Sequence, residues 1–247
     1  MSRPHPWLHA FLDVPAEHAD TAARFWAAAS GAEIGAPWPE HPEFRSLDPA
    51  TGSRYLHVQR HSGPPRLHLD LTTPRVDAEA ARLVALGAVA HARFRWWQVL
   101  RSPGGLPFCL VEETPGRSRP EPVRWPGGHH SRVARLVVDA PADRYDAECA
   151  FWAAATGWSD STNGRRPEFR SLRPPDSSPL QLLLHRLDER DVPVRAHLDI
   201  DTDDLDAEVR RLVALGAAVT AEHNGSWVTM VDPIGLPFCT RGCATPE

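Results

Sequence analysis

The sequence predicts an α+β fold made of four consecutive βαβββ modules. Two observations support this prediction. The chain of 247 residues repeats itself once over nearly its whole length, which is typical of tandem domains. Within each half, a short run of alternating polarity precedes a helical pattern, further strand patterns follow, and the same order then starts again.

The repeat consists of strings that occur once in each half at nearly constant spacing. They are FWAAASG and FWAAATG at 25–31 and 151–157, PEFRSL at 42–47 and 167–172, RLVALGA at 82–88 and 211–217, and GLPFC at 105–109 and 235–239. Because this spacing drifts by only a few residues, the halves differ by short loop insertions. We therefore expect two homologous domains, at 1–114 and 132–247.

The segment 115–131 between the halves is rich in Pro, Gly and Arg and has no hydrophobic period. Such a composition predicts an interdomain linker. We expect its adjacent His129 and His130 to face solvent.

The first module begins with a strand at 9–13, where HAFLD alternates in polarity. A helix is expected at 16–30, because its apolar residues recur at helical spacing and Gly31 follows where a C-cap belongs. Strands are then expected at 44–47 and 55–59.

The second module repeats this order. The HLDL string at 68–71 predicts a strand, and a helix is expected at 77–86 with Gly87 as its C-cap. The remaining strands are expected at 88–91, 97–100 and 108–111.

The charge balance excludes several classes of function. The chain holds 27 basic residues, all of them Arg, against 32 acidic ones, for a net charge of −5. This balance provides no broad positive field for nucleic acid or an anionic membrane. The absence of Lys excludes a P-loop and Schiff-base chemistry. The apolar runs are too short to span a membrane and the first residues lack the apolar core of a secretion signal, so we expect a cytoplasmic globular protein.

With these strings, the sequence resembles the vicinal oxygen chelate superfamily, which includes glyoxalases, extradiol dioxygenases and bleomycin-resistance proteins. The resemblance is carried by FWAAASG, HLDL, RLVALGA and RSPGGLPFCLVE in the first half, and by FWAAATG, HLDI, DTDDLDAEVRRLVALGA and VDPIGLPFC in the second. The match covers nearly all residues outside the linker. It implies two glyoxalase-like domains, in each of which two modules curve their mixed sheets around an open cup.

In this family, residues of the first and last strands of each module hold the metal where one is present. By resemblance, the corresponding positions are His9, His68, Arg135 and His197 on first strands, positions near His57, Gln59, Leu183 and His185 on fourth strands, and Cys109 and Cys239 on last strands. Metal-binding members carry Glu at the last-strand position. The two Cys residues depart from that pattern, and so does Arg135.

Strand alternation adds carboxylates to these positions. Residues two apart on a strand share a face, so Asp70 accompanies His68 and Asp199 accompanies His197. So many polar groups are costly to bury without a role. We therefore predict a divalent metal (zinc, nickel, iron or manganese) in the first cup. Its expected ligands are His9, His68 and His57.

Two alternatives remain for these polar residues. They could satisfy neighbouring backbone and side-chain groups, as most buried polar atoms do. His68, Asp70 and His9 could also form the facial triad of iron oxygenases.

Other repeated residues are expected in the core. Trp26 and Trp152 fit core packing by their helical period. Cys109 and Cys239 lie in apolar PFC strings that offer no electropositive setting for a reactive thiolate, so we expect them to pack in the core as well.

Three functions remain open. The first is an enzyme of the lyase or isomerase kind, with a small oxygenated molecule in the cup and His9 and His68 as catalytic residues. The second is a non-catalytic protein of the bleomycin-resistance type that sequesters an antibiotic. The third is a scaffold in which one repeat only completes the interface of the other. The expected ligand-binding residues are Gln59, Asp70, Trp97, His185, His197, Asp199 and Trp227. We expect a monomer or a homodimer.

Overall fold

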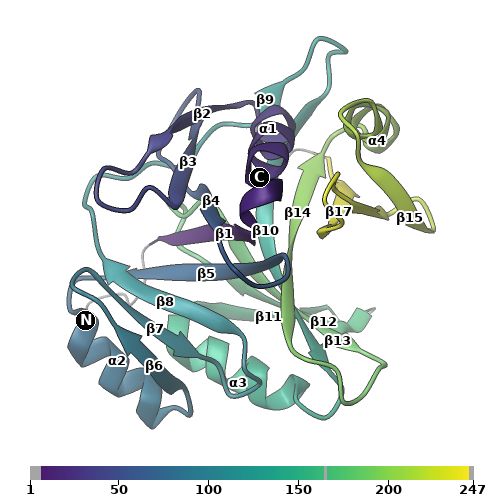
Figure 1. Ribbon diagram of the computed structural model, residues 1–247. Helices are drawn as coiled ribbons and strands as arrows, with labels where there is room; N and C mark the ends of the chain where they lie inside the picture. The colour runs from purple at the N-terminus through teal and green to yellow at the C-terminus, as the bar shows by residue number, and fades with distance from the viewer. Residues whose placement is uncertain (1–6, 164–165, 245–247) are drawn as a thin grey trace. The chain divides into compact units, whose positions relative to one another are not determined.

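The computed structural model describes residues 7–163 and 166–244, whose elements follow one another as four modules (Figure 1). The first module contains β1 (Leu8–Val14), the 3-10 turn η1 (Ala16–His18), α1 (Ala19–Ser30), β2 (Ala32–Pro37), β3 (Phe44–Pro49) and β4 (Leu56–Arg60). The second contains β5 (Arg66–Thr73), α2 (Val76–Ala85), β6 (Val89–Arg93), β7 (Trp97–Arg101) and β8 (Pro107–Glu112).

The second half repeats this order after a short strand, β9 (Val123–Arg124). The third module contains β10 (His130–Pro141), α3 (Tyr145–Thr156), β11 (Ser159–Asn163), β12 (Arg166–Arg173) and β13 (Gln181–Leu187). The fourth contains β14 (Arg195–Thr202), α4 (Leu205–Ala214), β15 (Ala218–His223), β16 (Trp227–Val231) and β17 (Pro237–Gly242).

The strands form two mixed sheets with the same internal order. The first sheet runs β2-β3-β4-β1-β5-β8-β7-β6, and the second runs β11-β12-β13-β10-β14-β17-β16-β15 with β9 added against β10. β5 is parallel to β8 and β14 is parallel to β17, whereas hairpins such as β7 and β8 are antiparallel. The predicted α+β fold of βαβββ modules is therefore confirmed.

The sequence patterns missed two strands. β2 pairs with β3, but its string AEIGAP contains Gly and Pro and is mostly exposed, so it shows no alternation of apolar residues. The short strand β9 lies inside the segment predicted to be a linker. In contrast, the predicted end of α1 is correct, because Gly31 follows it at φ +67°, a left-handed conformation that Gly adopts without strain.

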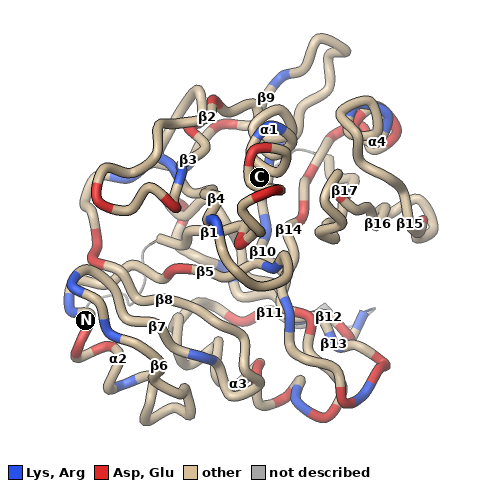
Figure 2. Tube along the Cα trace, viewed as in Figure 1, with Lys and Arg blue, Asp and Glu red and all other residues tan. Residues whose placement is uncertain are grey.

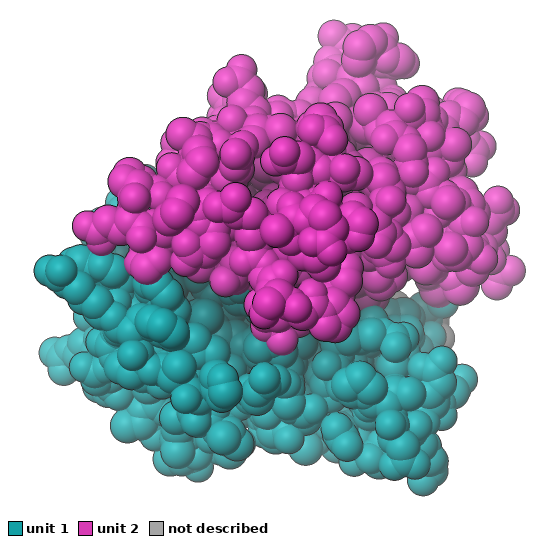
Figure 3. Space-filling model, viewed as in Figure 1, with its two compact units in different colours: residues 1–10, 68–118, 136–196 teal, residues 11–67, 119–135, 197–247 magenta. Residues whose placement is uncertain are grey.

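The chain also divides into two compact units that differ from the sequence halves (Figure 3). Unit 1 comprises Met1–Ala10, His68–Ser118 and Leu136–Ala196, and unit 2 comprises Phe11–Leu67, Arg119–Arg135 and His197–Glu247. Each unit therefore combines a module from one half with a module from the other. The domain bounds expected from the sequence repeat stay a prediction.

The repeated helix tryptophan lies in the core of each unit. In unit 2, Trp26 on α1 is fully buried, packs on Phe238 with ring centroids 5.4 Å apart, and donates from Nε1 to Asp232 Oδ2 at 2.9 Å. In unit 1, Trp152 on α3 packs on Phe108 with centroids 5.2 Å apart. Both tryptophans thus join a helix of one sequence half to a sheet strand of the other half. The predicted core role of both residues is confirmed.

A repeated arginine binds the end of a helix in each unit. Arg82, the first residue of RLVALGA, donates from α2 to the carbonyl oxygens of Ala154 and Ala155 at 3.0 and 2.6 Å. Its counterpart Arg211, on α4, donates in the same way to the last turn of α1. A cation at a helix C-terminus neutralises carbonyl groups that have no intrahelical partner. The repeat of RLVALGA therefore has a structural reason.

Residues 119–131 of the predicted linker belong to unit 2. His129 is only 8% exposed, and its Nε2 lies 2.8 Å from Oε2 of Glu208 on α4. The expectation that His129 faces solvent is therefore wrong. Its buried partner lies 79 residues further along the chain, and no local pattern indicates such a contact. His130 is half-exposed and lies 2.9 Å from Asp203.

The buried glutamates Glu148 and Glu208 are expected to affect stability with opposite pH dependence. Burial raises the pKa of Glu148 above its ordinary value of 4.5. Burial also opposes ionisation of Glu208, but Arg211, His129 and Ser131 hold the pKa of Glu208 below 4.5. The contribution of Glu148 is therefore present below pH 4.5 and lost as pH rises through its folded pKa, whereas that of Glu208 is lost as pH falls below 4.5.

Urea unfolding of Glu148→Gln and Glu208→Gln across this pH range checks the prediction. The free energy of unfolding of the wild type should exceed that of Glu148→Gln by a margin that shrinks as pH rises from 4.5. Its margin over Glu208→Gln should shrink as pH falls below 4.5. If the two differences in free energy of unfolding changed with pH in the same direction, the prediction would be contradicted.

Acidic and basic residues are interspersed along the trace of each unit, as Figure 2 shows. In the described part of the chain, no helix is both long and apolar enough to cross a membrane.

Candidate functional site

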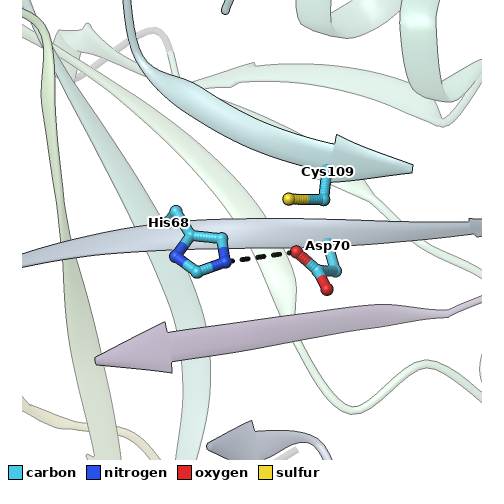
Figure 4. A group of neighbouring side chains, drawn as sticks. All are labelled: His68, Asp70 and Cys109. Carbon is cyan, nitrogen blue, oxygen red and sulfur yellow. Dashed lines mark ion pairs between the residues drawn. The ribbon is translucent and has the colours of Figure 1, made fainter. Parts of the chain in front are cut away.

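Three side chains with metal-binding atoms meet on two neighbouring strands of unit 1. His68 and Asp70 lie two residues apart on β5, and Asp70 is in register with Cys109 on the parallel strand β8. One ligand atom from each residue lies within 4.8 Å of the other two, and His68 Nε2 is 3.4 Å from Asp70 Oδ1. In Figure 4 the Cys109 sulfur points from β8 toward the His68 and Asp70 side chains. We call this group the first cluster.

The first cluster is buried and polar. His68, Asp70 and Cys109 are all at least nine-tenths buried, and Asp70 Oδ1 has no hydrogen-bond partner among the described residues. Burial, together with the neighbouring Asp70 carboxylate, raises the pKa of Cys109 to about 12. The thiol is thus protonated at neutral pH unless a cation compensates its charge.

Unit 2 contains the same group at the matching positions. His197 and Asp199 on β14 meet Cys239 on the parallel strand β17, again with ligand atoms within 4.8 Å of one another. His197 Nε2 lies 3.3 Å from Asp199 Oδ1 and 3.7 Å from Cys239 Sγ. Asp199 Oδ1 also has no hydrogen-bond partner among the described residues. We call this group the second cluster.

The second cluster has additional polar neighbours. Thr229 Oγ1 lies 3.7 Å from Cys239 Sγ and 3.0 Å from His223 Nε2. In the first half, the residue in register with Cys109 on β7 is Val99, which cannot form such a bond. Cys239 is also more exposed than Cys109. The two clusters therefore share their three central residues and differ in their surroundings.

Both clusters fit a divalent metal by the chemistry of their donors. In each, an imidazole nitrogen, a carboxylate oxygen and a sulfur converge. The carboxylate oxygen is buried and makes no hydrogen bond to the described residues, although it forms an ion pair with the histidine. In the second cluster one nitrogen, His197 Nε2, faces both the carboxylate and the sulfur. A catalytic triad would instead use the two different ring nitrogens. Imidazole and thiolate together favour zinc or another borderline transition metal.

Two of the predicted metal ligands are not members of the first cluster. His9 on β1 is buried and contacts Trp7 edge-on, with ring centroids 6.1 Å apart. His57 on β4 lies 3.0 Å from Ser46 Oγ through Nδ1 and stacks on Phe11. Gln59 is half-buried at the end of β4. Their predicted roles in metal or ligand binding stay predictions.

The other predicted ligand-binding residues have partners within their own units. His185 Nδ1 lies 2.8 Å from Asp139 Oδ1. Trp97 stacks on Phe94, and Trp227 stacks on His223 with ring centroids 4.5 Å apart. Each stacking pair lies on one β-hairpin, so part of each tryptophan surface is already used in packing.

The two cysteines take part in polar clusters, which their apolar PFC strings did not indicate. Both were expected only to fill the core, yet each joins a histidine and an aspartate. Their identical position in both repeats, at the strand position where metal-binding relatives carry Glu, was the available signal. Strand alternation did correctly predict that His68 shares a face with Asp70, and His197 with Asp199. Arg135, the other departure, forms an ion pair with Asp201 and belongs to neither cluster.

Fold and site together define a tandem protein with one potential metal cluster in each half. The family model described as a glyoxalase-like domain matches residues 9–111 and again 135–241. The chain therefore belongs to the glyoxalase-like domain family and carries two copies of the domain. This confirms the resemblance to the vicinal oxygen chelate superfamily.

Solved structures with the same fold include a metal-bound glyoxalase and a dioxygenase. The Mn(II)-bound glyoxalase from Novosphingobium aromaticivorans is 15% identical, with a TM-score of 0.67 over 97% of this chain and 82% of that one. The 2,2',3-trihydroxybiphenyl 1,2-dioxygenase from the dibenzofuran-degrading Sphingomonas wittichii strain RW1 is 13% identical, with a TM-score of 0.63 over 99% and 92%. Identities this low show the fold alone. A comparison with curated proteins found no match.

Proposed function

We propose that this protein binds a small oxygenated organic molecule at its clusters and converts it by lyase or isomerase chemistry. The observation that carries the proposal is the recurrence of a buried His–Asp–Cys group at matching positions in both halves. A buried carboxylate oxygen that makes no hydrogen bond is unfavourable in a purely structural role. Its presence in two copies argues for a ligand that compensates it.

In this proposal, His68, Asp70 and Cys109 hold a divalent metal in the first cluster. Such an ion would polarise a substrate oxygen. His9 lies on β1, next to β5 in the strand order, and acts as the proton-transferring base. Trp97 offers its remaining half-buried surface to the substrate. In unit 2 the corresponding residues are His197, Asp199 and Cys239 of the second cluster, together with Trp227.

Family membership supports a small-molecule ligand, because the similar solved structures include a glyoxalase and dioxygenases of aromatic compounds. A protein of the bleomycin-resistance type remains the alternative, because Trp97 and Trp227 provide flat surfaces that can stack on a ligand without any chemistry.

Metal content and ligand response test the proposal together. Protein purified without chelators should retain divalent metal. It should also be stabilised against heat by hemithioacetals of methylglyoxal or by catechols, because ligands that bind the folded state shift its stability. Turnover of the stabilising compound would support the enzyme, and stabilisation without turnover the sequestering protein.

His68→Ala is expected to abolish metal retention at the first cluster and the ligand response there. His91→Ala is the matched control, because His91 is an exposed histidine on β6 of the same half. Metal content below about one tenth of an ion per chain in the wild type would contradict the metal-dependent proposal. An unchanged ligand response in His68→Ala would contradict the role of His68.

A further inference from the structure

Unit 2 contains a cavity of about 220 Å³ that includes no residue of either cluster. Its walls come from the end of α1, the end of β3 with the turn that follows, the segment 120–124 and the start of β10. β9 lies against the end of α1, since a Cβ on Gly31 would come within 2.8 Å of the Val123 side chain (Figure 1). The segment predicted to be only a linker thus forms one wall of the cavity.

The walls are held in place by contacts between distant segments. The backbone N–H of Glu121 donates to Thr51 Oγ1 at 3.0 Å. A Cβ on Gly52 would lie 2.6 Å from the Pro120 nitrogen, so the turn after β3 and the linker touch directly. Tyr55 donates from its buried hydroxyl to the Val133 carbonyl oxygen at 3.1 Å. The cavity therefore exists before any ligand binds, which lowers the entropic cost of binding.

One cavity wall carries a buried positive charge. Arg132 is 5% exposed, and its guanidinium is repelled by Arg119 and Arg135 and attracted by Asp201. Asp201 is already paired with Arg135, and Arg241 Nε lies 3.7 Å from it. Four arginines in this region, Arg119, Arg132, Arg135 and Arg241, therefore outnumber the two carboxylates of Asp199 and Asp201.

The other charged residues that line the cavity, Glu121 and Arg124, are exposed and have opposite signs. Because their charges cancel, the net positive charge around Arg132 stays the same. A buried guanidinium with surplus positive charge around it favours an anionic partner, above all a carboxylate, which matches its geometry.

The rest of the lining selects for a compact apolar body. Leu47, Leu56, Pro122 and Val123 line the cavity beside Arg132. Its volume is smaller than the roughly 300–1,000 Å³ of pockets that take drug-sized ligands. We propose that this cavity is a second binding site, separate from the clusters, for a small organic carboxylate whose charged group pairs with Arg132.

Benzoate is a suitable probe, with benzamide as an uncharged control of nearly the same shape. Calorimetry or ligand-observed NMR with chelator-treated wild-type protein should show benzoate binding at least about tenfold more tightly than benzamide, as expected for one charge-assisted hydrogen-bonded pair. Arg132→Gln should remove this preference, whereas Arg124→Gln, a change at an exposed arginine of the same cavity, should retain it.

Two further variants keep the test decisive. Ala50→Trp fills the cavity from an exposed lining position, so it should abolish benzoate binding even if Arg132→Gln fails to fold. Cys109→Ala with Cys239→Ala disables both clusters and should bind benzoate like the wild type, which separates this site from the proposed function. Absence of benzoate binding to the wild type, equal binding of benzoate and benzamide, or full benzoate binding by Ala50→Trp would overturn the proposal.

Discussion

Addition of Co²⁺ to the metal-free protein is expected to produce thiolate-to-metal absorption in the near ultraviolet from two ions per chain. Each cluster contributes one sulfur, and the clusters share the same three donor residues. A metal-bound thiol is deprotonated outright even where burial otherwise keeps it neutral. The absorption therefore reports directly on coordination by cysteine, independently of any catalytic activity.

Cys109→Ala should remove about half of this absorption and weaken binding at the first cluster at least about tenfold, since loss of even an outer contact to a metal ligand costs that much. Cys239→Ala should remove the other half, and the double variant should show none. Cys243→Ala is the control, because Cys243 belongs to neither cluster. Equal absorption in the wild type and the double variant would show that the cysteines are not ligands.

The second large effect is expected for Trp26→Ala, which should lower the free energy of unfolding by about 3–5 kcal/mol, as for other buried aromatic residues. Trp26 lies on α1, is fully buried, and packs against Phe238 on β17. About 1–3 kcal/mol of this loss comes from the buried carboxylate of Asp232, which is deprived of one donor. Guanidinium unfolding monitored by circular dichroism measures the change.

Comparison variants separate the two causes. Trp26→Phe keeps most of the apolar contact and loses only the N–H, so it should cost about 1–3 kcal/mol. Trp96→Ala removes a 46% exposed tryptophan on the turn between β6 and β7, and should change stability by less than about 0.5 kcal/mol. A loss below about 1 kcal/mol for Trp26→Ala would contradict the role of Trp26 in joining α1 to β17.

Local patterns predicted most of the modules. The strands around His9 and His68 and the helix ends at Gly31 and Gly87 follow from polarity alternation and cap chemistry within a few residues. β2 was missed because its Gly and Pro remove the pattern that marks a strand. The shared face of His68 and Asp70 followed from strand alternation, whereas their contact with Cys109 did not.

The cavity beside Arg132 gave no signal in the sequence. Its walls combine a helix end, a turn and a segment whose composition indicates a free linker. A segment without regular periodicity can still be held by single contacts, such as the bond from Glu121 to Thr51, which local composition does not encode.

The sequence by itself determined the duplication, the βαβββ order and the pairing of histidine with aspartate on one strand face, because these depend on spacing within a single element or on direct repetition. The tertiary structure alone decided which distant residues meet. The parallel pairing of β5 with β8 joins Asp70 to Cys109, and the packing of α1 on β17 makes a unit from two sequence halves. Both depend on strand order and register between segments far apart in the chain, and these are set by the energy of the whole packed core rather than by any local pattern.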